Sequence, residues 1–323
     1  MPMNQSKPQP RDLVLLLGFT LCGFSLIFYS KPISAAVTQA LTLCTQVLLP
    51  SLFPFFVFSA LLIDSHAVQP FVRFFEKPFR FLFGLPGCFS TVLLLGAVGG
   101  YPVGARTAAN TYQQGLCSRA DAEKALYFCN NAGPAFLIGA IGTGLLGDAR
   151  LGLQLYGIHL LSALTLGFIN RKRISIVKSN SFPPIPEKRV AGIPLFLHAV
   201  RDSFSAYLNV CAFVLIFAVL SCLLMHLPIA GFLQRLPGGS VLWRGLLSGT
   251  LELTSGISLL AHASLPPVIL LPVLSFLCGW GGFSVQLQTI SILRDEGLSC
   301  RRYLKGKLLH GIVSAMLTAI ICR

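Results

Sequence analysis

The chain has 323 residues, of which 54% are hydrophobic and 11% are charged, and its mean hydropathy is +0.73. Soluble domains carry about 25% charged residues, so the composition excludes an ordinary soluble enzyme and predicts a polytopic membrane protein. The net charge of +14 comes from basic residues clustered between the apolar segments, which is typical of cytoplasmic loops rather than of a nucleic-acid-binding surface.

The first apolar segments predict two crossings and a surface helix. Lys7 and Arg11 place the N-terminus in the cytoplasm, so residues 12–30 cross outward and residues 40–63 return. The first stretch resembles a signal peptide, but its length and the crossing that follows favour an uncleaved helix. Residues 68–84 interleave Phe with Arg and Lys, which predicts an amphipathic helix on the cytoplasmic surface of the membrane.

Three segments complete the first half. Residues 87–114 begin with an apolar leg too short to cross a membrane, continue through Gly and Pro, and end in a more polar leg, which predicts a re-entrant hairpin. Residues 120–147 are apolar but are interrupted by Asn-Asn-Ala-Gly-Pro at 130–134, which predicts a broken helix crossing outward. Residues 150–169 cross back, so the basic loop 170–190 lies in the cytoplasm.

The second half repeats this order. Residues 203–227 cross outward, and residues 240–263 form a second hairpin. Residues 266–293 form a helix broken at Gly-Trp-Gly-Gly, which returns the chain to the basic, cytoplasmic stretch 294–307. Residues 308–322 cross outward. Apart from the N-terminal span at 12–30, each half then makes three crossings, and an odd number turns the second half upside down.

The predicted fold is therefore an all-α polytopic membrane protein. It is an inverted repeat of two halves, each with spanning helices, a re-entrant hairpin and a broken helix. Residues 1–35 form an N-terminal span and residues 36–170 the first repeat. Residues 171–192 form a basic cytoplasmic linker, and residues 193–323 form the second repeat.

The two interruptions predict one substrate site. Backbone freed from a helix at membrane depth must be satisfied by protein or water, and interrupted segments at matching places mark transporter binding sites. Asn130 and Asn131 offer amide groups, and Gly133 precedes a helix whose N-terminal amides favour an anion. The alternative is a proline kink with caps. Four residues of the second half take the matching part: Gly281, Gly282, Ser284 and Gln286.

Two charged residues stand in the hairpins. Glu252 lies inside an apolar segment, where a carboxylate costs about 2.5–3.5 kcal/mol. It is predicted to bind an ion, a proton or the substrate, or else to pair with Arg244 or a hairpin amide. Arg106 is predicted to bind a substrate carboxylate, to extend from a helix end to the interface, or to meet Glu252. Ser255 is a further candidate substrate contact.

The turn residues of the hairpins are predicted to form the gate and to allow close packing of helices. They are Gly99, Gly100, Tyr101, Pro102, Gly104 and Gly256. His159 and His310 hold equivalent positions in the last helix of each half, either as a proton relay or as packed, hydrogen-bonded side chains. The sequence shows no metal-ligand spacing, cofactor motif or catalytic grouping, so we expect no enzyme, cofactor or metal site.

These motifs resemble one known family. Gly99 to Arg106, the first break with its flanks, and the second-half runs 251–256 and 279–284 are similar to sporulation integral membrane proteins of the nucleoside-recognition, or Gate-domain, group. The likeness covers about residues 40–320, with Gly99 where the family has Ser. It implies a fold akin to the concentrative nucleoside transporters. It also implies a protein of spore-forming bacteria that moves dipicolinic acid across the mother-cell-derived forespore membrane.

Three functions stay open from the residues alone. They are transport of a small anion, transport of a nucleoside or another small metabolite, and a scaffold role in the membrane without transport. The expected partners are a small-molecule substrate and the lipid bilayer, with a coupling ion left open and no nucleic acid. Oligomeric state is not predicted.

Overall fold

A computed structural model describes residues 10–64, 69–171, 192–226, 231, 235–236 and 240–322 of the chain. Every regular element within these ranges is a helix, which confirms the predicted all-α class. The predicted linker at 171–192 lies outside the described residues except at its two ends.

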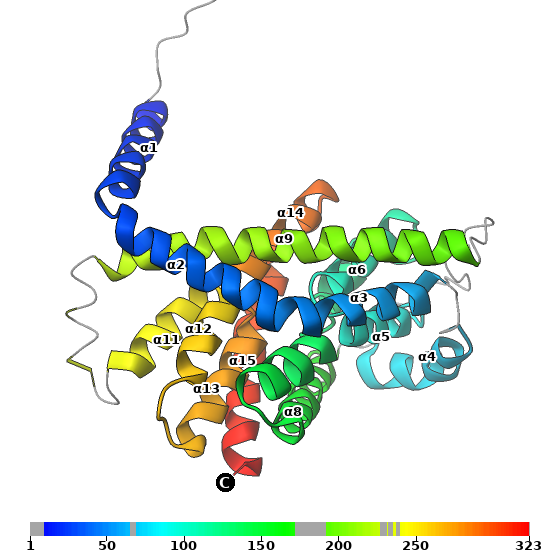
Figure 1. Ribbon diagram of the computed structural model, residues 1–323. Helices are drawn as coiled ribbons and strands as arrows, with labels where there is room; N and C mark the ends of the chain where they lie inside the picture. Colours follow the sequence, from blue (N-terminus) through cyan, green and yellow to red (C-terminus); the bar gives the residue numbers. More distant parts are fainter. Residues whose placement is uncertain are drawn as a thin grey trace, which may run out of the picture.

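The N-terminal helices form an arm and a long rod. Their bounds are α1 (Pro10–Phe28), α2 (Ser30–Leu43), η1 (Cys44–Leu48) and α3 (Leu49–Asp64), followed by α4 (Gln69–Phe83). The segment α2–η1–α3 runs almost without interruption, whereas α1 turns away from the bundle (Figure 1). The predicted surface helix is α4, in which Phe74 and Phe81 are exposed while Phe79 is buried.

The rest of the first half has the predicted order of hairpin, broken helix and terminal helix. The elements are α5 (Phe89–Gly99), α6 (Val103–Gln113), α7 (Arg119–Ala125), η2 (Ala135–Leu145) and α8 (Ala149–Ile169). Residues 126–134 separate α7 from η2. Pro134 has no amide hydrogen, so it cannot donate the backbone hydrogen bond that would continue one helix through this segment. Ser118 and Asp121 form a capping box at the start of α7, and Asp148 caps α8 through two amides.

The second half shows the same order. Its elements are α9 (Ile193–Met225), α11 (Ser240–Leu251), α12 (Leu253–Ala261), α13 (Pro267–Trp280), α14 (Gly282–Asp295) and α15 (Cys300–Ile321). Here the break is short. Gly281 has φ +88°, a left-handed conformation that glycine adopts readily and that ends α13.

Five helices within the described residues are long and apolar enough to cross a membrane. They are Ser30–Leu61, Ala149–Ile169, Ile193–Met225, Pro267–Asp295 and Cys300–Ile321. The predicted crossing at residues 12–30 corresponds to α1. One predicted crossing differs, because the first broken segment contributes only the short apolar helix Ala135–Leu145. The inversion of the halves stays a prediction.

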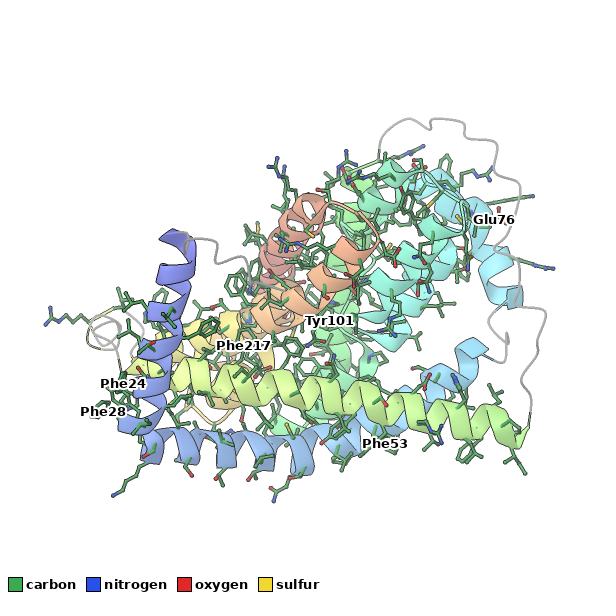
Figure 2. The ribbon with its side chains drawn as sticks, turned by 90° about the horizontal axis from the view of Figure 1, so that it is seen from above. Phe24, Phe28, Phe53, Glu76, Tyr101 and Phe217 are labelled. Atoms are coloured by element: carbon green, nitrogen blue, oxygen red, sulfur yellow. The ribbon has the colours of Figure 1, made fainter. Side chains whose placement is uncertain are left out.

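The long helices cover one side of the molecule. α9 and the α2–α3 rod lie side by side and cross over the remaining helices (Figures 1 and 2). With 33 residues, α9 is about 50 Å long at 1.5 Å per residue, whereas the hydrocarbon layer is about 30 Å thick. A helix this long must tilt or extend beyond the layer.

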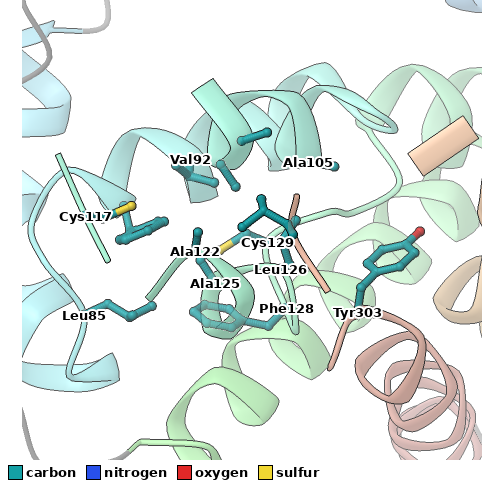
Figure 3. Close-up of a cluster of buried hydrophobic side chains, with 14 of the residues drawn as sticks. Leu85, Val92, Ala105, Cys117, Ala122, Ala125, Leu126, Phe128, Cys129 and Tyr303 are labelled. Atoms are coloured by element: carbon teal, nitrogen blue, oxygen red, sulfur yellow. The ribbon is translucent and has the colours of Figure 1, made fainter. Parts of the chain in front are cut away.

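Buried side chains tie the two halves together. One apolar cluster joins α4 to α7 and reaches Tyr303 of α15 (Figure 3). Its aromatic centre is Phe79, Phe83 and Phe128, with ring centroids 4.7 to 6.4 Å apart. A second cluster packs α12 and α13 against η2 and α8. The tip of the first hairpin lies close to the middle of the molecule, where Figure 2 labels Tyr101.

Candidate functional site

Each hairpin tip packs directly on the break of its own half. A Cβ atom added to Gly133 would lie 3.1 Å from Cα of Gly100, and one added to Gly282 would lie 3.0 Å from the amide nitrogen of Leu253. Gly104 is equally close to the first break, because its Cβ would lie 2.4 Å from the carbonyl oxygen of Cys129. The glycines thus allow backbone-to-backbone contact that any side chain would block.

The two tips and the two breaks surround one cavity of about 60 Å³. Its polar side contains six of the predicted residues: Gly99, Gly100, Tyr101, Gly133, Glu252 and Ser284. Its apolar side comes from α3 and α9 and contains Leu52, Phe56, Val210, Phe213 and Val214. The structure therefore brings residues from both halves to one place.

Four helices begin at this cavity. The lining includes Tyr101 just before α6, Ala135 and Phe136 at the start of η2, and Ser284 in the first turn of α14. Leu253 and Thr254 begin α12, the fourth helix. Helix N-termini carry partial positive charge and unpaired amides, so their convergence favours a negatively charged group.

Glu252 is the cap of α12. Its side chain is 2% exposed and accepts hydrogen bonds from the amides of Thr254 at 2.9 Å and Ser255 at 2.6 Å. Within the described residues it forms no ion pair with Arg244 or Arg106. The carboxylate therefore binds hairpin amides, which was one of the predicted alternatives, while it also lines the cavity.

Asn130 holds the first break against three helices. Its Oδ1 accepts from the amide of Ala105 at 3.3 Å, and its Nδ2 donates to Thr289 Oγ1 at 3.2 Å and to Tyr303 Oη at 3.4 Å. It does not line the cavity. Its side chain thus serves to position the break between the first hairpin, α14 and α15.

Asn131 is buried more deeply still. Its Nδ2 donates to the carbonyl of Phe128 at 3.0 Å, whereas its Oδ1 is buried without a protein partner. Like Asn130, it stands outside the cavity lining. A buried acceptor without a partner is unusual in proteins, which marks this break as a place where a further donor or a water can bind.

Side chains at and just after the second break bond to backbone carbonyls and pack against one another. Trp280 Nε1 donates to the carbonyl of Thr250 at 3.2 Å, and the Trp280 ring meets Phe283 edge to face. Gln286 Nε2 donates to the carbonyl of Trp280 at 3.2 Å. These contacts leave Trp280 packed against the second hairpin. Gly281 follows it in the turn, and Gly282 starts α14.

Besides Asn130 and Asn131, the predicted substrate contacts Arg106 and Ser255 also lie outside the cavity lining. Arg106 is exposed on α6 and is absent from the lining. The side chain occupies the outer face of its helix, as in the predicted alternative in which it extends away from the site, and its contact with a substrate carboxylate stays a prediction. Ser255 donates its amide to Glu252, but it lines a separate pocket together with Arg244. Gly256 packs the second hairpin on itself, since its Cβ would lie 2.1 Å from Cα of Gly249.

The two predicted histidines meet. Their ring centroids lie 4.2 Å apart, and His310 Nε2 donates to the carbonyl of His159 at 2.9 Å. His159 Nε2 accepts from the amide of Ala132 at 3.0 Å, so this ring satisfies a backbone group of the first break. Both rings are buried and hydrogen-bonded, as in the packing alternative.

Lys307 is a buried lysine that was not predicted as a site residue. It ends the basic stretch 294–307, but α15 begins at Cys300, so Lys307 lies two turns inside the helix and is 2% exposed. Lys307 precedes His310 by three positions, so the two side chains share one face of α15, and this spacing could have indicated that Lys307 is buried. The offset of 151 positions between His159 and His310 likewise matches Lys307 with Tyr156 on α8.

Within the described residues no group of histidines, cysteines or carboxylates could hold a metal ion. The groups that the structure describes at the centre are backbone amides, freed carbonyls, the Glu252 carboxylate and the Lys307 amine.

Comparison with known proteins agrees with this picture. A family model described as nucleoside recognition, Gate, matches residues 45–149. The sporulation integral membrane protein YlbJ of Bacillus subtilis (strain 168) is 29% identical over 347 residues, which cover 99% of this chain and 84% of that protein. No solved structure matches. The similarity confirms the resemblance predicted from the motifs and, with the five long apolar helices, identifies an integral membrane protein.

Proposed function

We propose that the protein is a membrane transporter of a small anionic metabolite, with dipicolinic acid as the candidate substrate. One observation carries the anion assignment: four helix N-termini, two from hairpins and two from broken helices, begin at one cavity. Glu252 already caps α12, so the N-termini of α6, η2 and α14 remain to face a bound anion.

The sporulation relationship supports the choice of anion. The relative from Bacillus subtilis is described as a sporulation integral membrane protein, and the motif resemblance implies dipicolinate, a flat aromatic dicarboxylate. A dianion suits several converging amide groups better than a single arginine, because each helix N-terminus contributes only partial charge. The exposed position of Arg106 therefore does not weaken the proposal.

The cavity must widen to admit such a substrate. Sites for small molecules enclose about 300–1,000 Å³, whereas this cavity measures about 60 Å³. One wall is built from side chains of α3 and α9, and the opposite wall from the hairpin tips and breaks. We infer that the arrangement is a closed state and that relative movement of these two walls opens the site, as in alternating access.

Uptake by the purified protein in liposomes tests the proposal. We expect accumulation of radiolabelled dipicolinate, and we expect Asn131→Leu and Gly282→Leu each to abolish it while both variants still insert. Normal uptake by both variants would remove the breaks from the site. A protein that inserts but moves no member of a substrate panel would be a scaffold.

A nucleoside is the second candidate, because the matching family is described as nucleoside recognition. The polar side chains of the cavity lining include Thr254, Ser284 and Gln288, which are neutral hydrogen-bonding groups suited to a sugar or a base. Competition by unlabelled uridine and adenosine against labelled dipicolinate separates the two. Preferential uptake of either nucleoside would replace the anion assignment.

A further inference from the structure

Lys307 connects the three parts of the central site. Its Nζ donates a hydrogen bond of 3.1 Å to the carbonyl oxygen of Asn130 in the first break, and it lies 4.9 Å from the ring centroid of Tyr101 at the first hairpin tip. A Cβ atom on Gly281 would lie 3.7 Å from both Lys307 Cε and Tyr101 Cζ, so the lysine stem also passes the second break.

No carboxylate neutralises this lysine within the described residues. The ion pairs found among them, such as Arg80–Glu76, Arg119–Glu123 and His198–Asp202, do not involve Lys307. A buried ammonium group without a counter-ion is costly, and its compensation here comes from a carbonyl dipole and an aromatic face. A site retains such a group only when surrounding structure or a ligand compensates its charge.

The titratable neighbours of Lys307 include no carboxylate among the described residues. They are His159 on α8, Cys278 on α13, His310 and Tyr303 on α15, and Tyr101. His159 accepts from the Ala132 amide, His310 donates to a carbonyl, and Tyr101 donates its hydroxyl to the carbonyl of Cys278. The ammonium is therefore the positive group at the first break.

Unwound carbonyls of broken helices are the groups that coordinate coupling cations in transporters. At this break the Asn130 carbonyl is already bound by an ammonium group that belongs to the chain. We propose that Lys307 is a tethered cation that takes the place of a bound metal ion at the first break, so that anion transport needs no external Na⁺. This inference rests on the proposed transport function.

Ion replacement tests the wild-type protein. Liposomes containing it are assayed for uptake of radiolabelled dipicolinate with Na⁺ on both sides, and again with all Na⁺ replaced by N-methylglucamine. We expect equal rates in the two conditions. A loss of uptake without Na⁺, with Lys307 intact, would overturn the proposal, because the site would then need a second cation.

Substitutions test the lysine itself. Lys307→Ala removes the stem and the charge, and we expect uptake to fall at least about fivefold, the lower end of usual couplings between two bound groups. Ethylammonium added to the assay should restore part of it by filling the vacated space. Lys307→Met fills that space without charge, so its uptake should be impaired and ethylammonium should not restore it. Full uptake by Lys307→Met would contradict the proposal.

Lys305→Ala is the matched control, since Lys305 is exposed on the same helix. It should transport normally and ignore ethylammonium. Melting temperatures in detergent supply a readout that needs no substrate: ethylammonium should raise that of Lys307→Ala and leave those of wild type and Lys305→Ala unchanged. If ethylammonium stabilises Lys307→Ala but the wild-type protein takes up no dipicolinate, the transport proposal is refuted and the tethered cation is not. Wild-type uptake without stabilisation of Lys307→Ala would refute the tethered cation.

Discussion

The Glu252 carboxylate has two roles: it caps α12, and it lines the central cavity. Both oxygens are engaged by backbone amides, so the residue compensates the N-terminal charge of its own hairpin helix. A carboxylate at this place lowers the local positive potential. It leaves the other three helix N-termini as the attractive groups for an anion.

Replacing Glu252 by glutamine should destabilise the second hairpin. A glutamine amide has one acceptor oxygen, so one of the two capped N–H groups loses its partner. We expect the free energy of unfolding to fall by about 1–3 kcal/mol, measured as a lower melting temperature in detergent. Asp202→Asn is the control, because that carboxylate is exposed. An unchanged melting temperature for Glu252→Gln would show that the cap contributes nothing.

At the scale of elements, hairpin and break behave as one unit in each half. The contact is made by glycine backbones: Gly100 on Gly133 in the first half, and Leu253 on Gly282 in the second. Gly100 and Gly282 also have φ of +73° and +72°, which residues with a side chain rarely adopt. The tips can therefore approach the breaks only with glycine at these positions.

Gly133→Ala should separate the first hairpin from its break. The new methyl group would meet Cα of Gly100 and the carbonyl of Val98 at 3.1 Å, and neither backbone atom can move alone. We expect loss of most dipicolinate uptake in liposomes. Gly157→Ala on α8 has nothing within 4 Å of its Cβ and should transport normally. Equal uptake by the two variants would contradict the close approach.

Sequence patterns predicted where the helices and breaks lie better than they predicted which side chains are buried. Both hairpins and both breaks could be predicted, since glycine and proline interrupt an apolar helix through their own backbone chemistry. The position of Arg106 could not, because it depends on which face of α6 packs inward. The burial of Lys307 could not be predicted for a related reason: charge clustering predicts loops, but it does not show where a helix of the same composition begins.

At the scale of the whole molecule, the matching positions of the halves meet at the centre. His159 and His310 face each other across α8 and α15, and Arg150 and Arg301 occupy the second residue of these same two helices. If the halves are inverted in the membrane, these two equivalent arginines lie on opposite sides of it. Equal orientation of the halves would place them on the same side.

Cysteine labelling of intact cells distinguishes the two arrangements. Arg150 and Arg301 are both exposed. In a variant depleted of reactive cysteines, Arg150→Cys should react with an impermeant maleimide from outside. Arg301→Cys should react only after permeabilisation, because the basic stretch around it is retained in the cytoplasm.

Two native cysteines can remain as internal controls. Burial raises the pKa of the Cys88 thiol to about 11 and that of Cys117 to about 12, which suppresses the thiolate that reacts. A parent protein carrying only these two should stay unlabelled before and after permeabilisation. Labelling of Arg150→Cys and Arg301→Cys from the same side would rule out an inverted repeat, and with it the argument that the two breaks face one site from opposite directions.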